Sequence, residues 1–400
     1  MKTKIIIIVG FLVAVAAILL FTMKGDDKTG PGLAPSGSAV GSGSAAGPAP
    51  QAQVEISMLY SSEKKDWIEA AAAAFQKDHP EIKLTLNAKG SLDAAQAIVD
   101  GKEKPTIVSP ADSLVMNLLV ADWQTKNRSD LFPTSGDDAP QPLVITPLVF
   151  VAWEDRAEVL LKAAGGTITW KAIHKAVSSN EGWPAIKGSK EWGFVKLGHT
   201  DPTRSNSGLQ ALLSMSLEYF GKPSGLEVGD VLKPKYQDYI KELEKGVPKF
   251  EISTGQFMTD MIRFGPSKYD IAVVYENLAI SQIENAQGRW GNLKIYYPAT
   301  TLWSDHPVAI AKGDWVTEPQ RKAARSFIAH LKSRSMQELA LNFGFRPADP
   351  TVPIKTADAK NPFTRLATQG VKVDINPMAN PPDGQVIRNL MMMWSRVVAK

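Results

Sequence analysis

The sequence predicts an α/β protein of two lobes, preceded by a transmembrane helix and a flexible linker. Three observations lead to this prediction. Strand-like and helix-like segments alternate from about residue 53 onward, which is typical of a mostly parallel sheet with helices on both faces. About 350 residues follow the non-globular start, which is too many for one ordinary core. Two long extended runs, at 143–153 and 293–298, can carry the chain from one lobe to the other and back.

The N-terminal segment has the features of a membrane anchor. Ile5–Met23 is an uncharged run of 19 residues, and a helix of that length spans about 30 Å of hydrocarbon. Lys2 and Lys4 precede it, so residues 1–23 are expected to form a signal anchor, with the short N-terminus cytoplasmic. The alternative is a cleaved signal peptide, although the apolar run is long for one. The predicted location is the cell membrane, single-pass, with the folded domain periplasmic or extracellular.

Residues 24–52 are rich in Gly, Ser, Ala and Pro and predict a disordered linker, because such a segment buries too little apolar surface to offset its ordering entropy. The net charge of +4 is spread along the chain without a basic block, which argues against nucleic-acid binding. Cysteine is absent, which excludes disulfides, thiol catalysis and a lipidated cysteine anchor.

The first lobe is predicted to open with a strand at 54–60 and a helix at 63–79, whose apolar residues between Trp67 and Phe75 share one face. Strands at 82–86 and 106–108 and a helix at 92–100 follow. The apolar run at 143–153, interrupted by a proline, is interpreted as a strand that leaves one lobe and enters the next. Helices at 321–333, 335–343 and 387–398 complete the chain. The predicted lobes are 53–148 plus 298–400, and 149–297.

Polar residues gather where predicted strands meet helices. Ser61 and Ser62 follow the first strand, and Ser113 opens the helix after the third. In the run Thr200–Ser207, six of eight residues are hydroxylic, Asp or Asn, which is more than one helix cap needs. Hydroxyls beside free N–H groups at a helix N-terminus can bind an anion or a polar ligand, whereas any single junction of this kind can equally be a cap.

The predicted strand at 270–277 ends in an aromatic residue and a carboxylate, Tyr275 and Glu276. Both are candidates to line a cleft, and the alternative is a surface strand end with a capping residue. A Glu276 side chain inside the cleft would repel an oxyanion and favour a cation, a polyol or an amine.

Signals of catalysis are absent from the sequence. There is no G-x-S-x-G elbow, P-loop or H-E-x-x-H motif, and the five histidines show no metal-ligand spacing. His199 is more typical of a structural or cleft-lining histidine, and Asp305-His306-Pro307 of a turn. We therefore expect no enzyme activity, no catalytic or metal-binding residues and no cofactor, which disfavours a hydrolase.

Four segments resemble bacterial extracellular solute-binding proteins of the type II periplasmic-binding class, close to the molybdate/sulfate-like branch. They are Ser61-Ser62, 198–212, 296–307 and 343–347. The segment G-H-T-D-P-T-R-S-N-S-G at 198–208 is similar to one in family members of which some carry a von Willebrand type A domain. No such domain is evident here.

The resemblance implies two lobes joined by two crossing strands, a ligand between them and an ABC-type importer as partner. The expected function is a membrane-anchored extracytoplasmic protein that captures a small polar solute. An oxyanion is one candidate, because neutral donors suit it. Presentation of the solute to another membrane complex, a sensor role, and a ligand-free adhesion or scaffold role are the alternatives. The expected ligand contacts are Ser61, Ser62, Ser113, Thr200, Ser205, Ser207, Tyr275 and Glu276.

Overall fold

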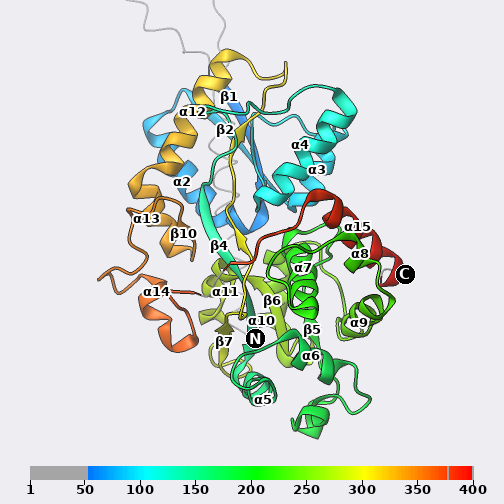
Figure 1. The fold of residues 1–400 in the computed structure, drawn as a ribbon. Helices are drawn as coiled ribbons and strands as arrows, with labels where there is room; N and C mark the ends of the chain where they lie inside the picture. Colours follow the sequence, from blue (N-terminus) through cyan, green and yellow to red (C-terminus); the bar gives the residue numbers. More distant parts are fainter. Residues whose placement is uncertain (1–52, 376–377, 399–400) are drawn as a thin grey trace, which may run out of the picture. The chain divides into compact units, whose positions relative to one another are not determined.

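The structure, a computed structural model, describes residues 53–375 and 378–398. The predicted anchor (1–23) and linker (24–52) lie outside these ranges. Within them, none of the helices combines the length and the apolar character needed to cross a membrane. The described chain forms two β-sheets, each covered by helices (Figure 1).

The first sheet has the strand order β2-β1-β3-β9. Its first three strands are parallel, and β9 is antiparallel to β3. Figure 1 shows α2, α12 and α13 on one side of this sheet and α3 and α4 on the other. The strands are β1 (Val54–Ser61), β2 (Ile82–Lys89), β3 (Ile107–Ser109) and β9 (Ala309–Ile310), and the helices are α2 (Lys65–Asp78), α3 (Ser91–Val99), α4 (Ser113–Asn127), α12 (Glu318–Lys332) and α13 (Arg334–Asn342).

The second sheet is built around β4 (Val144–Trp153), which pairs antiparallel with four strands. Only β5 and β6 pair in parallel, so this sheet is mixed and not mostly parallel as expected. The outgoing strand and the returning chain run in opposite directions and therefore pair antiparallel. The other strands are β5 (Leu197–Gly198), β6 (Ile271–Tyr275), β7 (Leu293–Tyr296), β8 (Trp303–Ser304) and β10 (Arg346–Pro347).

Between residues 154 and 282, six longer helices and one short one pack around the second sheet. They are α5 (Glu154–Ala164), α6 (Trp170–Val177), α7 (Asn206–Phe220), α8 (Val228–Val231), α9 (Pro234–Glu244), α10 (Thr254–Phe264) and α11 (Glu276–Gln282). Because side chains alternate along a strand, Leu148 and Phe150 of β4 share a core with α7, whereas Val149 and Val151 share another core with α10. Burial on both faces explains the near-continuous apolar run of β4.

The returning chain lies beside β4. Thr301 Oγ1 donates to the Leu148 carbonyl at 2.7 Å, and the Leu148 N–H donates to the Leu302 carbonyl at 2.8 Å. Beyond Leu302, β8 pairs with Thr146 and Pro147 of β4. Two segments of opposite direction therefore run together between the sheets.

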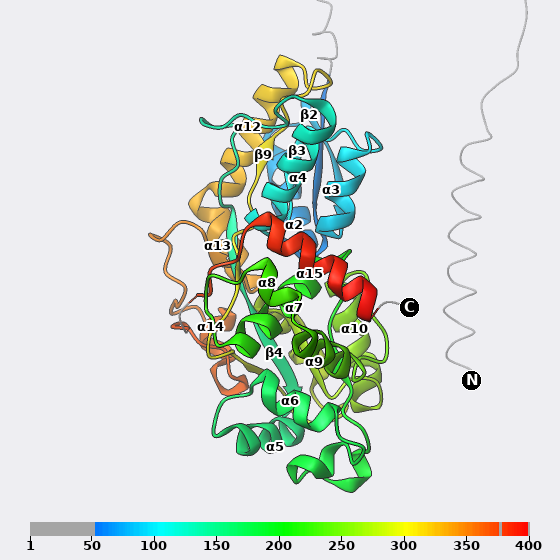
Figure 2. The same ribbon diagram turned by 45° about the vertical axis from the view of Figure 1, so that its right-hand side comes forward.

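The last part of the chain packs on the helices of the second sheet (Figure 2). Leu390 and Trp394 of α15 (Gly384–Val397) share a core with α7 and α9, and Trp394 Nε1 donates to Glu244 Oε1 at 2.7 Å. Phe363 of α14 (Pro362–Arg365) shares the core on the other face of β4. The predicted range 298–400 thus contains helices that contact the second sheet's helices, although it was assigned to the first lobe.

Candidate functional site

A buried polar cluster lies where the carboxyl ends of β1 and β3 meet the N-terminal part of α7 and the end of β6. In open α/β sheets this edge is where ligands bind. We call it the intersheet cluster, and each of its members is at most 8% exposed. Its members are Glu63, Lys64, Ser109, Asp112, Asn206, Gln210, Tyr275, Ser304 and His306.

Helix α7 supplies two amides to the cluster. Asn206 and Gln210 are four residues apart and therefore lie on one face of the helix. Gln210 Nε2 donates to Asp112 Oδ2 at 2.5 Å and to Ser304 Oγ at 2.8 Å, and Asn206 Nδ2 donates to Tyr275 Oη at 2.9 Å. Gly208 permits this placement, because a Cβ there would lie 2.1 Å from the Thr200 carbonyl oxygen.

The short 3-10 turn after β1 (Ser62–Lys64) supplies the only amine of the cluster. Lys64 Nζ donates to Ser61 Oγ at 2.7 Å and to the carbonyls of Ser109 and Pro110, both at 2.9 Å. Burial lowers the pKa of Lys64 to about 7, against the opposing attraction of Glu63. The amine is therefore near its titration midpoint at neutral pH.

His306 links Lys64 to the opposite wall. Its Nδ1 lies 3.3 Å from Glu63 Oε1 and 3.4 Å from Lys64 Nζ, and its ring packs edge-on against Tyr275. Burial and the charge of Lys64 lower the pKa of His306 to about 4, so the ring is neutral at pH 7. Its φ of 42° is unusual for a residue with a side chain.

The two carboxyl groups of the cluster have opposite pKa shifts. Burial, and then repulsion from Asp305, raises the pKa of Asp112 to about 6. For Glu63, burial would raise the pKa, but the nearby polar ring of His306 and the charge of Lys64 outweigh burial, and the pKa is lowered. Both groups are thus predominantly ionised at pH 7, which gives this edge a negative character.

Five buried side-chain atoms of the cluster have no hydrogen-bond partner within the described part of the chain. Buried polar atoms are normally paired, since an unpaired one costs about 1–3 kcal/mol. Among residues 53–375 and 378–398, one further such atom, Trp123 Nε1, lies elsewhere. This concentration makes the intersheet cluster the candidate ligand site. The five atoms are Glu63 Oε1, Ser109 Oγ, Asn206 Oδ1, Gln210 Oε1 and His306 Nε2.

The hydroxyls predicted at 200–207 contact one another. Ser207 Oγ lies 2.8 Å from Thr200 Oγ1 and 2.7 Å from Thr254 Oγ1, and Ser205 Oγ lies 3.4 Å from Ser207 Oγ. We call Thr200, Ser205, Ser207 and Thr254 the hydroxyl cluster. It adjoins the intersheet cluster, because Ser205 and Ser207 flank Asn206.

Three further predicted residues lie in or beside the intersheet cluster. Ser61 accepts the Lys64 ammonium and Tyr275 accepts the Asn206 amide, as described above. Ser62 Oγ lies 3.4 Å from Ser253 Oγ, across the gap between the first sheet and α10. These residues and the hydroxyl cluster account for six of the eight predicted contacts.

Ser113 and Glu276 instead bind protein groups. The N–H and hydroxyl of Ser113 both donate to the Asp305 carboxylate. Glu276 accepts from Arg346 at 2.7 and 2.9 Å and from the Tyr297 hydroxyl. Their contacts give no support to the ligand role predicted for them.

Several cluster residues were not singled out from the sequence. Asn206 lies within the polar run and Gln210 one turn later, so helical spacing is a signal that could have identified both. The sequence predicts a turn at His306, whereas the structure places its side chain fully inside the cluster. Glu63 and Lys64 carry no sequence signal, because charged residues after a strand usually face solvent.

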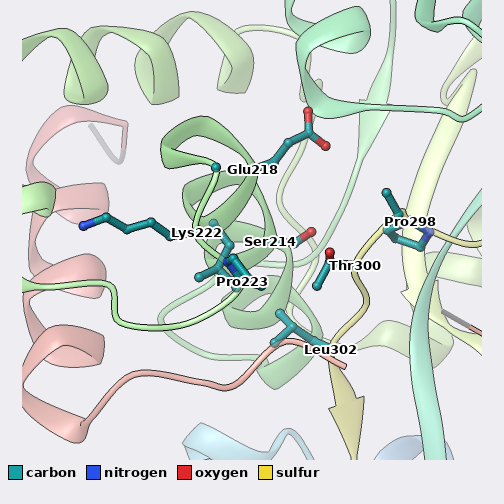
Figure 3. A pocket seen from close by; sticks show the side chains of 10 residues that line it. Ser214, Glu218, Lys222, Pro223, Pro298, Thr300 and Leu302 are labelled. Carbon is teal, nitrogen blue, oxygen red and sulfur yellow. The ribbon is translucent and has the colours of Figure 1, made fainter. Parts of the chain in front are cut away.

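A separate hollow of about 220 Å³ lies further along α7. Figure 3 shows Ser214, Glu218 and Lys222 on one side of it and Thr300 and Leu302 of the returning chain on the other. Ser214 Oγ accepts from Trp170 Nε1 at 2.9 Å. None of the buried unpaired atoms belongs to the residues that line this hollow, so we place the candidate site at the intersheet cluster.

The sequence pattern of the bacterial extracellular solute-binding proteins matches residues 56–346, a range that includes the whole intersheet cluster. The chain belongs to this family. The resemblance inferred from the sequence is therefore confirmed. A member of the bacterial extracellular solute-binding family is a binding protein and not an enzyme, and its folded domain is extracytoplasmic. A search of curated proteins finds no sequence match.

Comparison with solved structures shows that this chain has the two-lobed periplasmic-binding-protein fold. The sulfate-binding protein SubI of Mycobacterium tuberculosis is 17% identical with a TM-score of 0.54, over 82% of this chain and 93% of that one. A periplasmic thiamin-binding protein is 14% identical with a TM-score of 0.57, over 92% and 100%. AfuA of Actinobacillus pleuropneumoniae, solved with fructose-6-phosphate, is 16% identical with a TM-score of 0.53, over 86% and 98%.

Proposed function

We propose that this solute-binding protein captures a small polar solute between its lobes, against the intersheet cluster, and delivers it to an ABC-type permease. The five unpaired buried atoms support the proposal. Each costs desolvation free energy because it has no hydrogen bond, and a ligand that bonds to it removes that cost. Names of structures with this fold refer to ABC transporters and to solutes as different as sulfate and thiamin. The fold therefore supports transport without fixing the solute.

The proposed lobes differ from the predicted ones at the C-terminal end. We assign 53–148 and 298–347 to the first lobe, and 149–297 to the second. The packing of α14 and α15 supports placing the residues after 347 with the second lobe.

Contacts between the two lobes surround the cluster. Arg204 Nη2 binds Asp93 Oδ2 at 2.8 Å, Asn277 Nδ2 donates to the Glu63 carbonyl at 3.2 Å, and Ser62 approaches Ser253. These contacts, together with the burial of the cluster, correspond to closed lobes. We propose that a solute enters after they separate and that β4 and the returning chain act as the hinge.

An oxyanion and a polar organic solute are both compatible with this function. The hydroxyl cluster and the N-terminus of α7 support an oxyanion. The members of the hydroxyl cluster, however, already bond to one another. The proposed function is therefore stated for a small polar solute without restriction to anions.

We also propose that residues 5–23 hold the receptor at the membrane. The length and composition of this run support the anchor. N-terminal sequencing of membrane-extracted protein should give residue 1 or 2, whereas a start between residues 22 and 53 would indicate cleavage.

The function predicts ligand-dependent stabilisation. The full-length chain, freed of co-purified solute and then given that solute at about 100 times its Kd, should gain about 2.7 kcal/mol in its free energy of unfolding. Asn206→Leu should lose about half of this gain or more, because it removes one of the unpaired atoms and weakens binding about 10-fold or more. Asn389→Leu, at a partly exposed asparagine on α15, is the matched control and should retain it. A chain that carries no solute and gains no stability from any solute tested would favour the scaffold alternative.

A further inference from the structure

The orientation of Gln210 fixes one hydrogen-bond acceptor in the cluster. Its Nε2 donates to both the Asp112 carboxylate and Ser304 Oγ. An ionised carboxylate only accepts hydrogen bonds, so the amide nitrogen must face Asp112. The buried oxygen Oε1, which has no partner, is therefore an acceptor.

Two more unpaired acceptors belong to the intersheet cluster, and we call the three oxygens the acceptor patch. Asn206 Oδ1 is one helical turn before Gln210, with Nδ2 directed at Tyr275. Glu63 Oε1 is a carboxylate oxygen beside His306. Tyr275 connects Asn206 with His306. Its hydroxyl accepts from Asn206, and its ring centroid lies 6.1 Å from that of the His306 ring.

Several donors near these acceptors are already engaged. Each of the three protons of the Lys64 ammonium has an acceptor in Ser61, Ser109 or Pro110. The amide of Asn277 is bound to the Glu63 carbonyl, and the hydroxyl cluster is bonded within itself. Ser109 Oγ, the Tyr275 hydroxyl, the second N–H of Asn206 Nδ2 and the neutral ring of His306 remain as the groups that can donate.

Charge leads to the same conclusion. The carboxylates of Glu63 and Asp112 are buried at the patch, and Asp305 lies close enough to Asp112 to repel it. Lys64 is the only cation in the cluster, and its N–H groups donate to Ser61 and to the carbonyls of Ser109 and Pro110 at the strand ends. An oxyanion here would meet acceptors and negative charge.

We infer, resting on the proposed function, that the captured solute presents at least three hydrogen-bond donors to Glu63, Asn206 and Gln210, and is a polyhydroxylated or primary-amine compound and not an oxyanion. Hydroxyl and ammonium groups share the required chemistry, since both donate to carboxylate and amide oxygens. The solute thereby completes the bonding of the buried acceptors.

Counting the exchangeable hydrogens of the bound solute tests this inference directly. The full-length chain is purified from its native membranes without added ligand, and the released solute is weighed by mass spectrometry in H₂O and in D₂O. Three or more exchangeable hydrogens are expected. A co-purified solute with none, such as sulfate or molybdate, would overturn the inference and leave the proposed function standing.

Titrations separate the two sources of donors. Myo-inositol, putrescine, molybdate and sulfate are added to the solute-free full-length chain, and binding is measured by calorimetry. We expect saturable binding of myo-inositol or of putrescine. We expect no binding of molybdate or sulfate. Saturable binding of either anion alone would overturn the inference. If no solute co-purifies and no probe binds, the proposed function fails together with it.

A matched pair of variants tests the role of Asn206. Asn206→Leu should weaken binding of the donor-rich solute about 10-fold or more, because a buried donor of the ligand loses its acceptor. Asn206→Asp keeps the size and the acceptor, so it should retain binding of a polyol and strengthen that of an amine. Asn285→Asp, on an exposed turn, controls for the added charge. Weaker binding in Asn206→Asp than in Asn206→Leu would contradict the inferred ligand class.

Discussion

At the scale of single residues, the polar run could be predicted but the buried charges could not. The excess of polar residues at Thr200–Ser207 exceeds the need for one helix cap, and it places Asn206 near the site from sequence alone. Lys64 gives no such signal, because only the folded chain brings the carbonyls of Ser109 and Pro110 within 2.9 Å of its amine. A buried amine is recognisable only once its burial is known.

Lys64 should make stability depend on pH. Its pKa is lowered in the folded state to about 7, so the unfolded chain binds more protons from about pH 7 to 10. The stabilising contribution is present above the usual lysine pKa and is lost as pH falls toward 7. We therefore expect the free energy of unfolding to rise from pH 7 to about pH 9.5.

Chemical unfolding across this range checks the prediction, with Lys64→Met as the variant. The variant should be less stable, since two carbonyls lose their donor, and its stability should rise less with pH. Lys65→Met, at an exposed neighbouring lysine, is the control and should keep the wild-type slope. Equal slopes in wild type and Lys64→Met would contradict the lowered pKa.

At the scale of elements, the sequence predicts the long helices and strands but not the pairing of the short strands. The strand expected at 54–60 is β1, and the helix expected at 63–79 is α2, because both have a clear apolar period. The two-residue strands β5, β8, β9 and β10 have no period to read. Their pairing partners come from distant parts of the chain, and so the mixed character of the second sheet could not be predicted.

Breaking the ion pair that links β10 to α11 should destabilise the fold strongly. Arg346 and Glu276 are 2% and 0% exposed. Removing one partner leaves a buried charge unpaired. Arg346→Met should therefore lower the free energy of unfolding, measured in urea, by about 3–5 kcal/mol. Arg334→Met, which breaks the exposed pair with Glu338 on α13, should cost at most about 1 kcal/mol. Similar costs for the two variants would show that the buried pair does not stabilise the fold.

At the scale of the whole molecule, two lobes and two crossings were predictable, because a chain of this length exceeds one core and carries two long extended runs. The position of the C-terminal helices was not, since an amphipathic helix does not reveal which apolar surface it covers. The contacts between Arg204 and Asp93 and between Asn277 and Glu63 favour closure without a covalent link.

Solute should therefore change the dimensions of the protein. Small-angle scattering of the full-length chain should show a smaller radius of gyration at saturating co-purified solute than without it. Arg204→Ala should shift the solute-free protein toward the open form, by up to about fivefold for an exposed pair worth about 1 kcal/mol. Lys65→Ala, whose partner Glu69 lies on the same helix, should leave this balance unchanged. Identical scattering with and without solute would contradict closure.

The strand order of the first sheet has a consequence for biosynthesis. β3 acquires its neighbour β9 only when the ribosome has made about 200 further residues, and α12, which covers the same sheet, comes later still. Until then the nascent chain holds three parallel strands with an unpaired edge, and such edges readily join other chains. The second sheet's central strand has its partner β6 about 120 residues away, and synthesis completes that pair first. We therefore expect the N-terminal third to need protection from aggregation until β9 is made, and truncation before residue 309 to yield a chain dependent on chaperones.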